Sequence, residues 1–248
     1  MIRLDERGLR AVLLDIEGTT TPIAFVHEVL FPFARANLRA VLEARWRSPE
    51  VAEVRRQLAV ERDADLGRGE SPPPLRMAND ERALASLAAY VEWLMDRDRK
   101  SPGLKLLQGL IWKEGYRVGQ LHGQVFDDVP AAILRWRAGG IDVAIYSSGS
   151  ELAQRLLFQS TRQGDLTPHL KAFFDTAVGA KVDATSYARI ATALGRLPAE
   201  ILFVSDVTAE LEAAREAGMA VVLSLRPGNP PQAYTDTVES ITSLNEIF

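Results

Sequence analysis

The sequence predicts an α/β fold with a parallel sheet and an inserted helical domain. From Phe126 onward, short apolar segments alternate with helical segments of roughly ten residues, which is typical of a parallel sheet with right-handed crossovers. Another apolar segment, Ala11–Leu14, precedes roughly a hundred residues that show only helical spacing. This first segment can join the sheet only across an insertion. We therefore expect a core of residues 1–22 and 121–248, and a helical domain of residues 23–120.

The first expected element is a buried strand over Ala11–Leu14 that ends on Asp15. Glu17 and a Gly-Thr-Thr-Thr turn follow, so the strand delivers carboxylates to a polar loop. In open parallel sheets, ligands bind just beyond the carboxyl ends of the strands. Asp15 alone could equally start a turn, since Asp is common there. His27 follows closely enough to face the same cleft, although a surface role fits it equally well.

The insertion is expected to hold helices near residues 31–46, 49–63, 80–99 and 102–118, because its apolar residues recur at helical spacing. Asn79 or Asp80 is the expected cap of the third helix, and Ser101 before Pro102 the cap of the fourth. Glycines and prolines predict a loop over residues 65–79.

The core should continue with alternating elements. We expect helices over residues 128–139, 151–159, 186–194 and 209–217, and strands over 143–146, 173–174, 201–204 and 220–225. The tail, residues 238–248, suggests a last helix.

Composition excludes several classes of function. The 248 residues are 47% hydrophobic and 25% charged, which is ordinary for a globular protein. The absence of cysteine excludes disulfides and thiolate chemistry, and the three histidines lack ligand-like spacing for zinc. A net charge of -4 without a long basic run argues against nucleic acid or a membrane as partner. No apolar run reaches the roughly 18 residues of a membrane span, and no signal peptide is visible, so a cytoplasmic protein is expected.

Three later positions place further polar groups near the expected sheet edge. Ser147 and Ser148 follow one strand, Asp206 follows another, and Lys181 stands ahead of a helix. Serines at a strand-to-helix turn can bind an anion at the positive end of the helix. Ser150 fits an ordinary helix cap, which leaves Ser147 and Ser148 free for this role.

The charges indicate which anion and which cation would meet there. Asp15 and Asp206 are oxygen ligands suited to Mg²⁺, which takes one or two carboxylates with substrate phosphate. Without a metal, a carboxylate about 4 Å from a phosphate dianion would be repelled by roughly 8 kcal/mol at an effective dielectric near 20. A divalent cation with Lys181 offsets most of this and lets Asp15 attack phosphorus, giving an aspartyl-phosphate that water hydrolyses. Glu17 could protonate the leaving oxygen and then activate that water, while a backbone carbonyl of the loop reaches the metal.

These segments resemble a known superfamily. DIEGTT, YSSGS, the lysine of VGAKVD, and SDVTAELEAA are similar to the four ordered motifs of the haloacid dehalogenase superfamily. Glu17 stands where most phosphatases of that superfamily have aspartate. With LQGLIWKEGY, HGQVFDDVP, IYSSGSELAQ and RPGN, it narrows the resemblance to the enolase-phosphatases of methionine salvage, also called acireductone synthases. The likeness covers nearly the whole chain and is weakest over residues 47–80.

The resemblance implies a Rossmann-like sheet core whose helical insertion is a mobile cap. It implies catalytic roles for Asp15 as nucleophile, Glu17 as acid/base and Lys181 on the phosphoryl group. Substrate binding would fall to Ser147, Ser148 and Lys181, and Mg²⁺ binding to Asp15, Glu17 and Asp206.

The implied substrate is a phosphorylated diketone. By resemblance, 2,3-diketo-5-methylthiopentyl-1-phosphate is enolised and then dephosphorylated to 1,2-dihydroxy-3-keto-5-methylthiopentene by a monomeric enzyme. The base for enolisation stays open between Glu17 and a residue such as His27.

Three alternative functions share features with this sequence. A generic Mg²⁺-dependent phosphatase of the superfamily would share every motif, and only Glu17 and the RPGN tail argue against it. A receiver-type phospho-acceptor would be about half as long and lack the insertion. A docking module on an inactive fold would have lost the motif carboxylates, which are present here.

Overall fold

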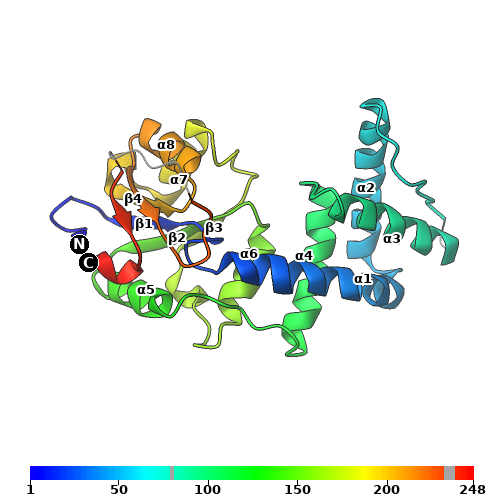
Figure 1. Ribbon diagram of the computed structural model, residues 1–248, viewed down its shortest axis with the longest axis horizontal. Coiled ribbons are helices and arrows are strands. Elements are labelled where there is room, and N and C mark those ends of the chain that lie inside the picture. Colours follow the sequence, from blue (N-terminus) through cyan, green and yellow to red (C-terminus); the bar gives the residue numbers. More distant parts are fainter. Residues whose placement is uncertain (79–80, 232–237) are drawn as a thin grey trace. The chain divides into compact units, whose positions relative to one another are not determined.

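The computed structural model describes residues 1–78, 81–231 and 238–248, which form two compact units. One unit comprises Met1–Glu28 with Leu121–Phe248, and the other comprises Val29–Gln120. The first unit contains β1 (Ala11–Leu14), α5 (Asp128–Ala138), β2 (Asp142–Tyr146), α6 (Glu151–Gln159), β3 (Ala172–Phe174), α7 (Ala184–Leu194), β4 (Ile201–Ser205), α8 (Thr208–Glu216), β5 (Ala220–Ser224) and β6 (Ser240–Ile241). The second unit contains α1 (Phe31–Arg45), α2 (Pro49–Gly67), α3 (Glu81–Met95) and α4 (Pro102–Arg117) (Figure 1).

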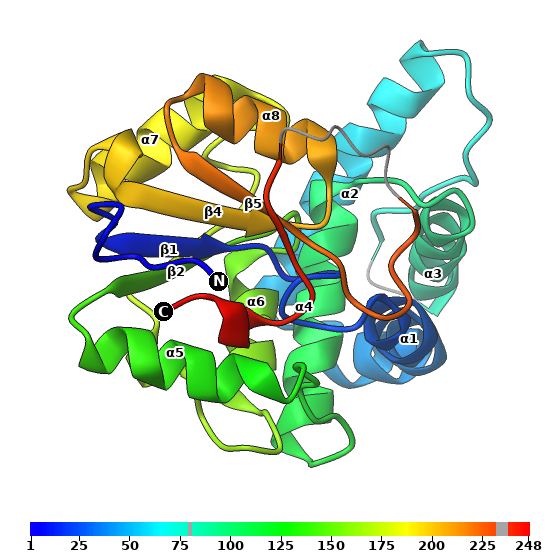
Figure 2. The ribbon, with the colours of Figure 1, turned by 60° about the vertical axis from the view of Figure 1, so that its left-hand side comes forward.

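The first unit is built on a parallel sheet of six described strands in the order β3-β2-β1-β4-β5-β6. β1 lies at the centre, with Leu14 opposite Ile145 of β2 and Val204 of β4. Helices α7 and α8 cover one face of the sheet, and α5 and α6 cover the other (Figure 2). The predicted α/β class and the parallel sheet are thereby confirmed.

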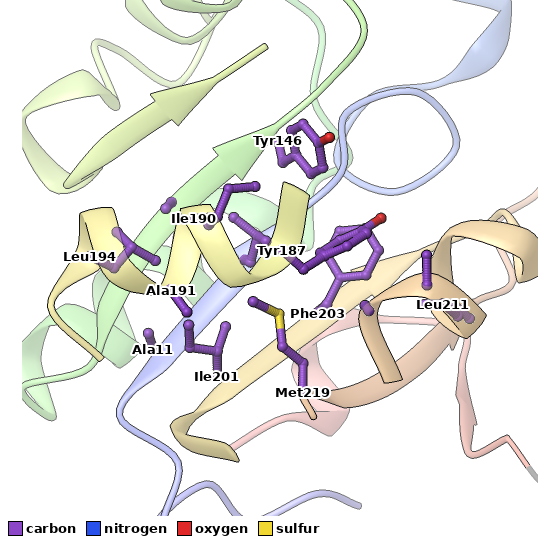
Figure 3. Packing of buried hydrophobic residues seen from close by; sticks show 14 of the residues in the cluster. Ala11, Tyr146, Tyr187, Ile190, Ala191, Leu194, Ile201, Phe203, Leu211 and Met219 are labelled. Carbon is purple, nitrogen blue, oxygen red and sulfur yellow. The ribbon is translucent and has the colours of Figure 1, made fainter. Parts of the chain in front are cut away.

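Alternation along the central strands explains how the core forms. Ala11 and Leu13 of β1 belong to one buried cluster with residues of α7 and α8. Figure 3 shows Tyr187 of α7 packed beside Phe203 of β4 within this cluster, and their rings meet edge to face at 5.1 Å between centroids. Each such buried side chain contributes about 1.5–3 kcal/mol. Because every second residue of a strand points to the same face, Asp15 continues the Leu13 side.

The expected core elements lie within two residues of their predicted bounds, except at the tail. The predicted last helix over residues 238–248 is wrong. Ser240–Ile241 instead forms β6, and Leu244–Glu246 forms a short 3-10 helix. The reason is tertiary: the carboxylate of Asp128 accepts hydrogen bonds from the Ser243 hydroxyl (2.7 Å) and the Leu244 amide (2.6 Å), which holds the tail in a non-helical path.

Two helix ends predicted for the helical unit are wrong. α2 continues to Gly67, beyond the predicted residue 63, because buried Asp65 accepts hydrogen bonds from Tyr90 (2.7 Å) and Arg99 (2.6 Å). α3 ends at Met95, before the predicted residue 99, and Asp98 adopts a left-handed φ of 47°. The predicted cap at residues 79–80 lies outside the described residues.

Packing inside the helical unit follows its apolar stripes. α4 packs against α1 and α2, and α1 packs against α3. Ser101 caps α4, as its place before Pro102 predicts, by accepting a hydrogen bond from the Leu104 amide at 2.9 Å. The π-helical turn Phe25–Leu30 precedes α1, and Trp112 donates to the carbonyl of Leu30 at 2.9 Å.

Across the three described ranges, no helix is both long and apolar enough to cross a membrane.

Candidate active site

Asp15 stands at the carboxyl edge of the sheet and begins a tightly closed loop. Its amide donates to the carbonyl of Val204 at 3.0 Å, so it is held in register with β4. The next carbonyl, of Ile16, accepts hydrogen bonds from the amides of Thr19 (3.2 Å), Thr20 (2.9 Å) and Thr21 (2.8 Å). These bonds fold the loop back on itself and fix the direction in which the Asp15 side chain leaves the strand.

Lys181 is the direct partner of Asp15. Its ammonium lies 2.5 Å from the Asp15 carboxylate and 2.6 Å from that of Glu210, and its side chain is only 9% exposed. The hydroxyl of Tyr187 donates to the carbonyl of Lys181 at 2.6 Å, which anchors the lysine to α7. The structure thus joins residues 166 positions apart in one buried ion pair.

Sequence reasoning missed Glu210. It lies in the first turn of α8, one helical turn after Asp206, and accepts a hydrogen bond from the Ser205 hydroxyl at 2.9 Å. An acidic residue at this spacing after a strand-end aspartate was the signal that could have revealed it. Its position beside Lys181 depends on the packing of α8 against β4 and β5, which the local sequence does not show.

The electrostatics of the site follow from its burial and its excess of carboxylates. Burial, and then the charges of Asp15 and Glu210, raise the pKa of Asp206 to about 7. Burial and the charge of Asp15 likewise raise the pKa of Glu210 to about 7. Burial alone would lower the pKa of Lys181, but the charges of Asp15 and Glu210 outweigh it and raise that pKa.

This donor set fits a divalent cation. Three carboxylates, those of Asp15, Asp206 and Glu210, share one buried region with the single ammonium of Lys181. Among the residues that the structure describes, no three His, Cys, Asp or Glu side chains are grouped to hold a metal. Mg²⁺ does not need such a group, because it commonly takes one or two carboxylates and completes its octahedron with water and phosphate oxygens.

Glu17 is placed differently from the other expected carboxylates. Its carboxylate lies 2.8 Å from Nε2 of His27, and the side chains of Glu17 and His27 are 41% and 54% exposed. Its backbone forms a bridge with Thr21. The structure therefore pairs Glu17 with His27, whereas Asp15 pairs with Lys181.

The serines after β2 take separate positions. Ser147 is buried; its amide donates to the carbonyl of Phe174 at 3.1 Å, and its hydroxyl accepts from the Gly149 amide at 3.2 Å. Ser148 is exposed. Ser150 caps α6, as expected, by accepting from the amide of Ala153 at 3.4 Å. Since β2 lies beside β1, Ser147 and Ser148 follow at the same sheet edge as Asp15.

Comparisons with known proteins show the family of this chain. Residues 9–218 match the family model of the haloacid dehalogenase-like hydrolases. The chain is 49% identical to an enolase-phosphatase E1 of Synechococcus elongatus, over 96% of this chain and 98% of that protein. It is similar (TM-score 0.76, 32% identity) to the crystal structure of the UTR4 protein of Saccharomyces cerevisiae, over 95% of this chain and 98% of the yeast chain.

Some relatives are longer. The chain is 47% identical to a probable bifunctional methylthioribulose-1-phosphate dehydratase/enolase-phosphatase E1 of Vitis vinifera, over 98% of this chain. It spans 48% of that plant protein, about half of its length.

Proposed function

This chain belongs to the haloacid dehalogenase-like hydrolases and, among them, to the enolase-phosphatases, and from this membership we propose its reaction. It is a phosphatase with enolase activity that converts 2,3-diketo-5-methylthiopentyl-1-phosphate to 1,2-dihydroxy-3-keto-5-methylthiopentene in methionine salvage. The observation that carries the proposal is the buried Asp15–Lys181 pair at the carboxyl end of β1, in a chain 49% identical to an enolase-phosphatase.

For the phosphatase step, we propose that Asp15 is the nucleophile. Its carboxylate attacks phosphorus in line and forms an aspartyl-phosphate, while the bond to the leaving enol oxygen breaks. Lys181 lies 2.5 Å from Asp15 and neutralises charge on the phosphoryl oxygens as the nucleophile approaches. Ser147 and Ser148, ahead of the positive end of α6, supply hydroxyl donors to the substrate.

We propose Mg²⁺ as the cofactor, held by the carboxylates of Asp15 and Asp206 and by the backbone carbonyl of Glu17. When bound, it would supply the positive charge that draws the phosphate dianion to a carboxylate-rich site. The excess of carboxylates over cations described above supports this assignment.

The Glu17 carboxylate is the proposed acid and base. It would protonate the leaving oxygen and then take a proton from the water that hydrolyses the aspartyl-phosphate. Its position 2.8 Å from His27, which orients it, also makes Glu17 the candidate for moving the proton in enolisation. We also place the enzyme in the cytoplasm. We infer that it is a monomer, and light scattering after size exclusion would check its molar mass.

The proposal is tested by anaerobic NMR with the diketo phosphate, with and without Mg²⁺, following enol signals and inorganic phosphate together. We expect an enol phosphate that loses phosphate only when the metal is present. Release of phosphate from simple esters, with the diketone left unchanged, would make the chain a phosphatase of another substrate.

A further inference from the structure

The RPGN segment, residues 226–229, has no role in the reaction described above. It follows β5 and lies more than 200 positions from the Asp15 loop, yet its side chains reach the backbone of that loop. Asn229 donates to the carbonyl of Gly18 at 2.9 Å, and Arg226 donates through Nε to the carbonyl of Thr19 at 3.1 Å. Both contacts lie within the sheet unit.

These bonds hold backbone carbonyls of a loop whose amides are already hydrogen-bonded within the loop. The loop amides turn inward to the carbonyl of Ile16, so the carbonyls of Gly18, Thr19 and Thr20 must find donors elsewhere. Gly18 also accepts from the Ser224 hydroxyl (3.3 Å), and Thr20 accepts from the amide of Phe126 (3.0 Å). The position of the Gly18–Thr19 peptide is therefore set from the end of β5.

Arg226 is itself immobilised. It is buried, and one guanidinium nitrogen donates to the Asp128 carboxylate at 2.8 Å and to the Thr242 carbonyl at 3.1 Å. Its guanidinium also lies over the ring of Phe126, 4.5 Å from the centroid. A side chain held by α5, by the tail and by an aromatic ring presents its Nε–H to Thr19 from a fixed point.

Gly18 lies tightly between Asp206 and Asn229. Its φ is +73°, and a Cβ added there would overlap the Asp206 carboxylate and lie 3.1 Å from the Asn229 amide nitrogen. Only glycine allows this approach. The hydrogen bond from Asn229 thus determines how closely the loop that carries Asp15 and Glu17 approaches Asp206.

We propose that Arg226 and Asn229 are positioning residues, which hold the Gly18–Thr19 peptide and so set the spacing between the Asp15 loop and Asp206. This inference rests on the proposed function, because that spacing is where Mg²⁺ would bind. Residues that orient metal ligands through hydrogen bonds typically change metal affinity or activity about 10- to 100-fold when they are replaced.

The test compares two substitutions with matched controls. Asn229→Ala removes the donor to Gly18, and Arg226→Lys keeps the charge near Asp128 but loses the planar fork that reaches Thr19. Asn245→Ala and Arg215→Lys make the same chemical changes at exposed positions of the same unit. Each protein is titrated with Mg²⁺ by calorimetry, assayed for kcat and KM, and followed by hydrogen exchange over residues 15–22.

We expect Asn229→Ala and Arg226→Lys to weaken Mg²⁺ binding and lower kcat by ~10- to 100-fold, with KM changed much less. Hydrogen exchange over residues 15–22 should quicken in both, whereas the controls should match the wild type. Wild-type Mg²⁺ affinity and wild-type exchange in both folded variants would overturn the proposal. So would a loss of kcat that only follows a loss of folded protein.

The two proposals fail in different ways. If the wild type ignores the diketo phosphate, the proposed substrate is wrong, but Mg²⁺ binding and loop exchange still test the role of Asn229 without any substrate. If the wild type performs both steps and Asn229→Ala behaves like Asn245→Ala, only the positioning role is overturned.

Discussion

At the residue scale, the site depends on which charges share a buried space. Lys181 is 9% exposed and lies within 2.6 Å of two carboxylates, those of Asp15 and Glu210. In such a place a charge is expensive to leave unpaired, because it has lost its solvation. Substitutions at these positions therefore act on chemistry and stability together, and an experiment must separate the two effects.

Asp15→Asn should remove phosphate release while the fold persists. An amide has nearly the same shape but cannot attack phosphorus, so we expect kcat to fall by ~10³-fold or more. Phosphate release measures the loss, and circular dichroism with thermal unfolding verifies the fold. Asp5→Asn, at an exposed turn of the same unit, is the control. Appreciable release from folded Asp15→Asn would exclude the covalent mechanism.

Glu17→Gln and His27→Ala should affect the reaction to different degrees. If Glu17 transfers the protons, its amide variant should lose ~10²- to 10⁴-fold in kcat. His27 holds that carboxylate from an exposed position, so His27→Ala should cost at most ~10-fold. NMR of the two steps measures both variants. Equal losses in the two variants would contradict a purely supporting role for His27.

At the element scale, strand alternation and helix caps place the functional side chains. Tyr146 and Phe203 belong to the cluster beneath α7 and α8, as Leu13 does, and Asp15 follows Leu13 by two residues. The face that packs against these helices is therefore also the face from which Asp15 meets Lys181 and Glu210. The packing of α7 and α8 on this face of the sheet therefore also places these charges.

The two serine caps offer a graded test of helix starts. Ser101 is buried and accepts from Leu104 at 2.9 Å, whereas Ser150 is half-buried and accepts from Ala153 at 3.4 Å. Ser101→Ala should lower the free energy of unfolding by ~1 kcal/mol, and Ser150→Ala by ~0.5 kcal/mol. Urea unfolding monitored by circular dichroism measures both. The reverse order would show that cap geometry does not decide these values.

At the scale of the whole molecule, a charge cluster joins distant parts of the sheet unit at the opposite edge from the site. Asp142, at the start of β2, accepts hydrogen bonds from Lys171 (2.7 Å), Arg196 (2.8 Å) and Arg137 (3.2 Å). Burial alone would raise the pKa of Asp142, but the hydrogen bonds from Lys171 and Arg196 outweigh it and hold that pKa below its usual value.

The protein should therefore become less stable in acid, because Asp142 becomes protonated. Because the folded pKa lies below the unfolded value, the contribution of Asp142 is present above the unfolded pKa and is lost as the pH falls through the folded pKa. Asp142→Asn should unfold with ~2 kcal/mol less free energy at pH 7, a difference that shrinks below about pH 4. Urea unfolding at several pH values measures this, with Asp5→Asn as control. A constant difference across the pH range would refute the linkage.

Much of the architecture could be predicted because it depends on local signals. Apolar runs that end on polar residues revealed β1, β2 and β4, and the alternation after Phe126 revealed the parallel sheet. The predicted tail helix failed because Asp128, more than a hundred positions away, binds the amide of Leu244. α2 ran past its predicted end because Tyr90 and Arg99 hold buried Asp65.

The sequence by itself determined the fold class, the family and the chemical identity of the candidate residues, since strand periodicity and motif order are local properties. Only the tertiary structure decided that Lys181 meets Asp15, that Glu210 joins them and that Asn229 reaches Gly18. These pairings come from parallel strands ending at one edge and from buried polar groups that must find partners. Both conditions arise only when distant segments pack together.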